Sequence, residues 1–414
     1  MKGQDATGLP QRLPFRSALR PAARPRVMAQ LLAALLLVTA GALPTPAQEP
    51  AAEVSVRDGG LQSHPATHEC TPGHRVETHE ITLDSGAKRY AFRYTGCVDP
   101  SHGELRPSAE GNFGMPQPSS GNWYWGGFLQ VFINGSNATG YRLADMRVTE
   151  TGARGAFQAI WAHPDAEVGV RLMMLPGANH VLALVTWRPR PDAQIESVAV
   201  QLRCYPSFFT AARGRKGERH CQTPRTDQAE PETLELVPAE DSYLFYYDAV
   251  FDVARGEGDG PCAALVAPDG VEGGRVQIGD YAVITRIALE PQAPEARLAF
   301  YDFTGMTNAE AQAYLAAQGA EDLARLTETD FRPEPVRRFR LDQFRAEAEK
   351  LLADAGEDGE AFQPKVQELL DGATALKEQA EQGDWQAEAD LAALLDSSTE
   401  MLWKLRAFAA LNAP

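Results

Sequence analysis

A cluster of aromatic residues stands at the end of a long irregular stretch. Residues 98–127 are rich in Gly, Pro, Ser and Asn, and the stretch ends with Trp123, Tyr124 and Trp125. Sugar rings present C–H faces that pack on aromatic rings, while neighbouring polar groups bind sugar hydroxyls. The cluster predicts carbohydrate contacts by Trp123 and Trp125. The alternative is that the alternation of an extended chain places both indoles in the core.

A basic loop over residues 213–225 offers a second kind of binding chemistry. The side chains that we expect to contact a ligand are Arg213, Arg215, His220 and Arg225. Arginine forks bind carboxylates and sulfates through paired hydrogen bonds. This loop therefore predicts an anionic glycan, such as a uronate or a sulfated polymer. The alternative is a solvated loop whose charge is balanced by the acidic helices of the same chain.

Three side chains have the chemistry of acid–base catalysis. His102 lies near the carboxylates of Asp99 and Glu104. A histidine so placed acts as an acid or a base. Tyr124 offers a phenolic proton, and Arg219 offers a cation for a developing enolate. His102, Tyr124 and Arg219 are thus the catalytic candidates of a lyase or epimerase, although their spacing leaves open whether the chain is an enzyme at all.

The N-terminal histidines do not have the spacing of a metal site. His64, His68, His74 and His79 are irregularly spaced, whereas a metal site needs three or four converging ligands. The chain also lacks a C-x-x-C pair, a phosphate loop, a dinucleotide fingerprint and an H-E-x-x-H motif. We therefore expect neither a metal nor a cofactor, and we rank a metal-dependent hydrolase last.

The start of the chain predicts export. Six basic residues occupy positions 2–26, an apolar run follows over 27–38, and small residues continue to Ala47. A basic flank, a short apolar core and small residues before a cleavage point are the parts of a secretory signal. The sequence thus predicts a signal peptide over residues 1–47 and a secreted or periplasmic protein. A retained membrane anchor is the alternative.

Export makes disulfides expected for the five cysteines. Proximity in sequence pairs Cys70 with Cys97 and Cys204 with Cys221, which leaves Cys262 free. The net charge is −17, and it becomes −22 when residues 1–47 are removed. So acidic a chain is not expected to bind nucleic acid or anionic membranes.

Short strands separated by turn residues predict the fold. After a polar linker over 48–73, alternating runs recur about every ten residues between positions 74 and 305. We expect strands at 75–83, 89–94, 128–134, 141–149, 155–163, 166–174, 179–188, 194–204, 242–252, 262–267, 274–289 and 296–303. This spacing is typical of a large antiparallel β-sandwich, so the predicted fold class is mainly β.

Helices are expected after the sandwich. A helical connector over 306–332 contains a helix from Ala309 to Gln318 that Gly319 ends. A helical hairpin or three-helix segment follows over 333–414. Its apolar stripes must be buried, either against one another or against the sandwich.

Part of the predicted sandwich resembles a known architecture. The segments concerned are Trp123–Asn134, Tyr141–Val148, Phe157–His163 and Val276–Leu289. Together they resemble the antiparallel supersandwich of galactose-mutarotase-like proteins and several polysaccharide-processing enzymes. The layout is more similar still to secreted bacterial proteins of unknown function. The resemblance spans less than half of the chain and implies a carbohydrate-linked role, without assigning any residue by position.

Two functions from different classes follow. The first is a secreted protein that binds or processes carbohydrate on the β-sandwich. The second is a non-catalytic interaction protein that forms homo-oligomers through its C-terminal helices. Assembly lost on truncation after about Arg332 would distinguish the second from the first.

Overall fold

The computed structural model describes residues 52–65, 70, 73–99, 101, 111–207, 215–293 and 295–411. The predicted signal peptide lies outside these residues. Among the described helices, none combines the length and the apolar character needed to cross a membrane. The fold is mainly β, with helices after the last strand, as the sequence predicts.

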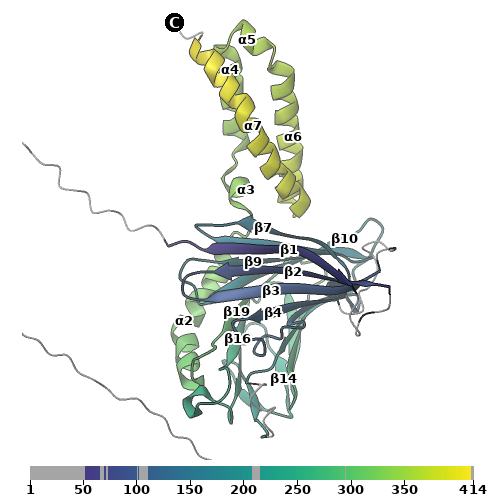
Figure 1. Ribbon diagram of the computed structural model, residues 1–414, viewed down its shortest axis with the longest axis vertical. Helices are drawn as coiled ribbons and strands as arrows, with labels where there is room; N and C mark the ends of the chain where they lie inside the picture. The colour runs from purple at the N-terminus through teal and green to yellow at the C-terminus, as the bar shows by residue number, and fades with distance from the viewer. Residues whose placement is uncertain are drawn as a thin grey trace, which may run out of the picture. The chain divides into compact units, whose positions relative to one another are not determined.

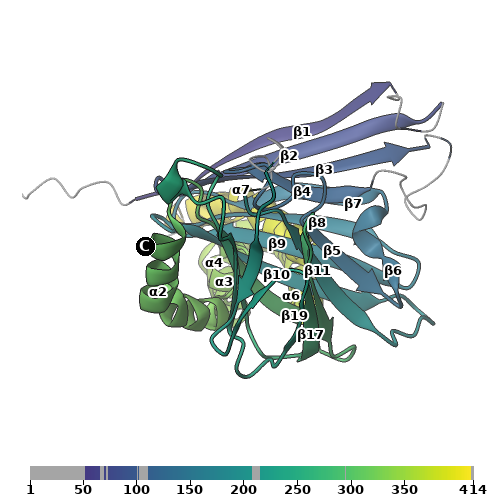
Figure 2. The same ribbon diagram turned by 90° about the horizontal axis from the view of Figure 1, so that it is seen from below.

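The strands form three antiparallel sheets (Figures 1 and 2). The four-stranded sheet has the order β1 (Ser55–Pro65), β2 (Arg75–Asp84), β3 (Arg89–Val98) and β4 (Asn112–Gln117). The nine-stranded sheet has the order β13 (Asp227–Ala229), β12 (Arg219–Gln222), β15 (Tyr243–Asp248), β16 (Cys262–Val266), β19 (Glu295–Asp302), β10 (His180–Pro189), β9 (Ala166–Met174), β8 (Gly155–Ala162) and β7 (Leu143–Glu150). The six-stranded sheet has the order β14 (Thr233–Leu236), β17 (Val271–Ile278), β18 (Val283–Leu289), β11 (Val198–Cys204), β5 (Leu129–Ile133) and β6 (Ser136–Asn137).

The central strands of the nine-stranded sheet are buried on both faces, and β10 shows how the sequence allows this. Successive side chains of a strand point to opposite faces. Val181, Ala183 and Val185 join the core that the three sheets share. Leu182 and Leu184 join a second apolar cluster on the other face of the strand. The nearly continuous apolar run of β10 is therefore what a strand covered on both sides requires.

Helix α2 (Asn308–Glu328) covers part of that second face (Figures 1 and 2). A capping box formed by Thr307 and Glu310 begins the helix. Its buried side chains include Ala311, Leu315 and Leu326, which belong to the same cluster as Leu182. The prediction that the helix ends at Gly319 is wrong, because Gly319 lies buried inside it.

The remaining helices pack mainly on one another. They are α3 (Glu334–Arg338), α4 (Leu341–Asp354), α5 (Glu357–Glu360), α6 (Gln363–Glu381) and α7 (Trp385–Leu411). Figure 1 shows α4, α6 and α7 side by side, and their buried side chains form two apolar clusters. The sequence left open whether the apolar stripes of these helices pack against one another or against the sandwich. They pack mostly against one another.

The stretch 98–127, predicted to be irregular, contains the mostly buried strand β4. Other strands missed by the sequence analysis lie in polar stretches. Strand β1 occupies part of the predicted linker, and all but two of its eleven residues are exposed. It pairs with β2 through its backbone, so its side chains carry no apolar alternation. Strands β12, β13 and β14 are only three or four residues long and lie inside the polar region 206–240.

A buried arginine ties α7 to the nine-stranded sheet. Arg171, in β9, is 1% exposed, and its Nη2 lies 2.7 Å from the Glu388 carboxylate and 2.8 Å from the Gln158 side-chain oxygen. Its Nη1 donates to the Phe331 carbonyl at 3.0 Å. The guanidinium also lies over the Trp385 ring, 4.3 Å from the ring centroid. Removing one partner of such a pair leaves the other charge buried.

We predict that Arg171→Ala lowers the free energy of unfolding by about 3–5 kcal/mol, because Glu388 then stays buried without its cation. Urea titration measures the change. Arg275→Ala is the matched control, since Arg275 forms an exposed pair with Glu235 that is worth less than about 1 kcal/mol. Equally small losses in the two variants would contradict the prediction.

A buried histidine lies between β10 and α2. His180 Nδ1 lies 3.6 Å from Asp322 Oδ2, which also accepts the Tyr301 hydroxyl at 2.7 Å. Arg325 faces the same carboxylate at 3.4 Å. Burial lowers the pKa of His180 below its ordinary 6.5, and Asp322 opposes this shift.

Because the folded pKa of His180 is lowered, the unfolded chain takes up this proton first as the pH falls. We predict that the free energy of unfolding falls as the pH drops below 6.5 toward the lowered pKa of His180. In the His180→Gln variant, the free energy of unfolding should fall less over the same pH range. Urea titrations from about pH 7.5 to about pH 5 measure the slope. The control is His64→Gln, on exposed β1, which should keep the original slope. An unchanged slope in His180→Gln would contradict the prediction.

Candidate functional site

Trp123 is fully buried and anchors the aromatic segment in the core. Its indole Nε1 donates to the Tyr301 carbonyl at 2.8 Å, and its ring makes edge contacts with Phe128, Tyr246 and Phe300. The prediction that Trp123 contacts a ligand is therefore wrong. The chain turns over residues 124–127, so the alternation that would bury both indoles stops after Trp123, and Trp125 is 46% exposed.

Two segments far apart in sequence meet at this point. Trp123 forms an antiparallel bridge with Cys204, and the Tyr124 amide donates to the Arg203 carbonyl at 3.2 Å. The Tyr205 amide donates in turn to the Gly121 carbonyl at 3.1 Å. The end of the 98–127 stretch thus lies against the end of β11.

This pairing assembles a row of four aromatic rings. The Tyr124 ring contacts Trp125 at a centroid distance of 5.9 Å and Tyr205 at 4.8 Å, and Tyr205 contacts Tyr281 at 5.3 Å. Tyr281 is 61% exposed. We call Tyr124, Trp125, Tyr205 and Tyr281 the aromatic platform. Its two ends are exposed, while its middle is fixed by backbone pairing.

A buried polar network holds the chain just before the platform. Ser119 Oγ donates to Asp259 at 2.8 Å, and the Asn122 amide donates to Asp302 at 3.1 Å. Asp302 is fully buried, which raises the pKa of its carboxyl group. Because buried polar groups must find partners, these bonds specify one path for residues 119–122. The path delivers Tyr124 and Trp125 to the surface.

Arg219 connects the basic loop to the platform. Its Nη1 donates to the carbonyl of Asp280, the residue before Tyr281 in the turn between β17 and β18. The side chain is only 1% exposed, and its Nε and Nη2 have no hydrogen-bond partner among the described residues. The structure therefore brings Tyr124 and Trp125 together and attaches Arg219 to the turn that carries Tyr281. It adds three that the sequence missed: Arg203, Tyr205 and Tyr281.

The platform has a cation beside its rings and a protonated phenol within it. The Arg203 guanidinium lies 6.0 Å from the centre of the Tyr124 ring. Burial raises the pKa of Tyr205 to about 12, against a smaller opposing effect of Arg203. At neutral pH the Tyr205 phenol thus keeps its proton and serves as a hydrogen-bonding group.

The other basic candidates pair mostly with carboxylates of the same chain. Arg225 forms a two-pronged pair with Asp241, and Arg215 pairs with Glu257. His220 stacks on Tyr247 and lies 3.0 Å from Asp227. The sequence analysis expected the counter-charges of this loop on the acidic helices, whereas Asp241 and Glu257 lie in loops between strands. Arg213 and His102 lie outside the described residues, so the predictions for these two residues stay predictions.

One of the two predicted disulfides is present. Cys70 and Cys97 are bonded. The predicted Cys204–Cys221 bridge is wrong, because both residues are free and buried, as is Cys262. Cys204 lies in the six-stranded sheet and Cys221 in the nine-stranded sheet, and both join the shared core as free thiols. Burial raises the pKa of the Cys221 and Cys262 thiols, which keeps them protonated.

A cavity of about 830 Å³ lies away from the platform. It lies between the outer face of β8–β10 and β19 and the segments 327–332 and 380–388. Charged groups line it, but Arg171, Arg188 and Arg297 are paired there with Glu388, Asp384 and Glu295. The arginines that line this cavity form ion pairs within the chain, so the platform is the better candidate for ligand binding.

No family model matches the sequence, and no curated protein sequence matches it. Among solved structures, an α-N-acetylgalactosaminidase from Bifidobacterium bifidum has 12% identity and a TM-score of 0.35, covering 64% of this chain and 41% of that chain. The α-galactosidase AgaB from Geobacillus stearothermophilus has 10% identity and a TM-score of 0.29, covering 54% and 39%. A TPR-domain containing protein from Parabacteroides distasonis has 10% identity and a TM-score of 0.34, covering 83% and 80%. These likenesses are too low to carry an argument.

A glycine in β4 makes room for the platform. A Cβ built on Gly114 would lie 1.7 Å from the Trp125 carbonyl oxygen, so the two backbones meet only because this residue has no side chain. We predict that Gly114→Ala displaces Trp125 and lowers the free energy of unfolding by about 1–3 kcal/mol, as overpacking does. Urea titration and near-ultraviolet circular dichroism measure the two effects.

The matched control is Gly273→Ala in β17, where a Cβ meets nothing within 4 Å. It should change stability by less than about 0.5 kcal/mol. If Gly114→Ala is as mild as this control, the close approach of β4 to Trp125 does not constrain the platform.

Proposed function

We propose that this protein binds a carbohydrate chain on the aromatic platform. The observation that carries the proposal is a row of four rings in continuous contact, with Trp125 and Tyr281 exposed at its ends. Exposed aromatic rings stack on the apolar faces of sugars, while phenols and guanidinium groups donate to sugar hydroxyls. Arg203, which is half-buried, supplies such a donor beside the rings.

The charge around the platform favours a neutral glycan over an anionic one. The sequence of the basic loop predicted an anionic ligand. In the structure, however, Arg215 pairs with Glu257, Arg225 pairs with Asp241, and Lys216 lies 3.0 Å from Glu230. The whole chain has a net charge of −17, which repels polyanions. Arg203 is therefore expected to orient a neutral chain rather than to neutralise an acidic one, while the buried Arg219 holds the turn that carries Tyr281.

The chemistry of the platform fits binding more directly than catalysis. A catalytic base must lose its proton near the working pH. The raised pKa of Tyr205 opposes this role at neutral pH. Binding alone requires only the exposed rings and the fixed donors, and we therefore propose a carbohydrate-binding protein.

We predict that Trp125→Ala and Tyr281→Ala each weaken binding of a neutral polysaccharide by about tenfold, because each removes an exposed stacking surface. Affinity electrophoresis against a panel of neutral and anionic polysaccharides measures the effect. Uronate and sulfated polymers in the same panel test the neutral preference, and tighter binding of these would overturn it.

Trp403→Ala is the matched control. Trp403 is a tryptophan on α7 that is 65% exposed, more than Trp125, and it lies on a different element. Its removal should leave affinity unchanged. Absence of binding across the whole panel, or equal losses in the Trp125 and Trp403 variants, would sink the proposal.

The alternative role in assembly gains less support. It was motivated by the apolar stripes of the C-terminal helices. Val366, Leu370 and Leu405 on these stripes are buried within the chain itself. The apolar faces of the C-terminal helices are thus largely buried within one chain and are not available to a second copy.

A further inference from the structure

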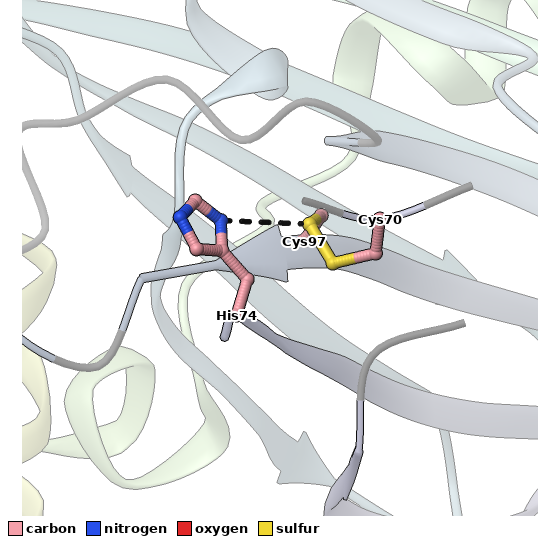
Figure 3. Close-up of side chains that lie close together, drawn as sticks. All are labelled: Cys70, His74 and Cys97. Atoms are coloured by element: carbon pink, nitrogen blue, oxygen red, sulfur yellow. Dashed lines mark hydrogen bonds between the residues drawn. A yellow bond between two sulfur atoms is a disulfide. The ribbon is translucent and has the colours of Figure 1, made fainter. Parts of the chain in front are cut away.

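A histidine lies directly against the Cys70–Cys97 disulfide. His74 Nδ1 is 3.7 Å from Cys97 Sγ (Figure 3). The two sulfurs and a nitrogen of His74 all lie within 4.8 Å of one another. Both cysteines are buried and His74 is half-buried, so the three ligand-type atoms form one small cluster shielded from solvent.

The register of a hairpin creates this cluster. Strands β2 and β3 pair from Arg75↔Val98 and Val76↔Cys97 onward. His74, just before β2, is therefore held beside the end of β3. The Cys70–Cys97 bond then brings in the third residue across a separation of 27 residues. Short spacing motifs miss such a site because the ligands converge through strand pairing.

A carboxylate lies near the imidazole. His74 Nε2 is 3.8 Å from Asp99 Oδ2, which is beyond direct hydrogen-bond distance. The carboxylate places a negative charge beside the cluster, and this charge favours a cation bound there. The other ring nitrogen, Nδ1, points to the sulfur of Cys97 (Figure 3). A neutral histidine binds metals through such a ring nitrogen.

The geometry points to a redox-gated site for a thiophilic cation of the zinc class, formed by Cys70, Cys97 and His74 when the disulfide is reduced. Zn–S bonds of about 2.3 Å and Zn–N bonds of about 2.1 Å in a tetrahedron place sulfur and nitrogen about 3.6 Å apart. The present distance from Nδ1 to Cys97 Sγ already matches this edge. Only the two sulfurs must move apart, by less than about 2 Å.

The gating step balances with a dithiol as reductant. The dithiol gives two electrons and two protons to the Cys70–Cys97 bond, which becomes two thiols, while the dithiol becomes its own disulfide. A divalent cation then displaces the two thiol protons and binds both thiolates and Nδ1 of His74. In the oxidised protein both sulfurs are bonded to each other, so the site is closed.

We predict that the full chain binds one equivalent of Zn²⁺ only after anaerobic reduction. Competition with a chromophoric chelator measures the affinity, and circular dichroism checks that the reduced protein stays folded. The oxidised protein controls for Cys204, Cys221 and Cys262, which are free thiols in either state. Equal Zn²⁺ binding by the two states, or none by the folded reduced protein, would overturn the inference.

Two variants separate the ligands from their surroundings. In the reduced protein, His74→Ala should weaken Zn²⁺ binding by at least tenfold, because a ligand is lost. Asp99→Ala should weaken it by less than His74→Ala does, because only a nearby negative charge is lost. His64→Ala, on the exposed face of β1, should leave the affinity unchanged. If His74→Ala binds as tightly as the His64 variant, the histidine is no ligand and the proposed site is wrong.

Discussion

The hydrogen bond from the Trp123 indole to the Tyr301 carbonyl fixes the segment on which the proposed site depends. Trp123 packs among aromatic rings of the core and bridges to Cys204, so residues before and after it have little freedom. Tyr124 then meets Tyr205, and Trp125 reaches the surface. A buried tryptophan that finds a partner for its N–H contributes both apolar burial and direction. The buried Trp123 ring therefore fixes the positions of Tyr124 and Trp125, although it contacts no ligand itself.

The sequence predicted those parts of the fold that rest on apolar periodicity. Strand β9 has the bounds expected from its pattern, Ala166–Met174, because both of its faces are buried. Strand β1 was not predicted, because it pairs with β2 through backbone groups and its exposed side chains show no apolar pattern.

The candidate site was also predicted only in part. Trp125 belongs to a visible cluster, whereas Tyr281 is a lone tyrosine in a turn that only tertiary packing brings to Tyr205.

The cysteines show why proximity in sequence is a weak guide to pairing. Cys70, which precedes β2, is bonded to Cys97 near the end of the β2–β3 hairpin. Cys204 and Cys221 are closer in sequence and share the core, yet they are free thiols. Reaction of a thiol requires the thiolate and access to an oxidant. The raised pKa of Cys221 and Cys262, together with their burial, therefore protects both thiols even where disulfides are favoured.

Charge pairing inside the chain also limits what the surface can bind. An arginine held by a carboxylate gives up part of its capacity for an outside anion, because its N–H donors are already used. Arg225 with Asp241 and Arg171 with Glu388 are such cases. Arg219 differs, because it is buried beside the turn that holds Tyr281 and keeps two donor atoms without described partners. The buried Arg219 guanidinium fixes the position of the turn and so of the exposed Tyr281 ring. Because its charge is buried, it offers little attraction to an anionic ligand, and stacking of uncharged sugars on the ring is favoured instead.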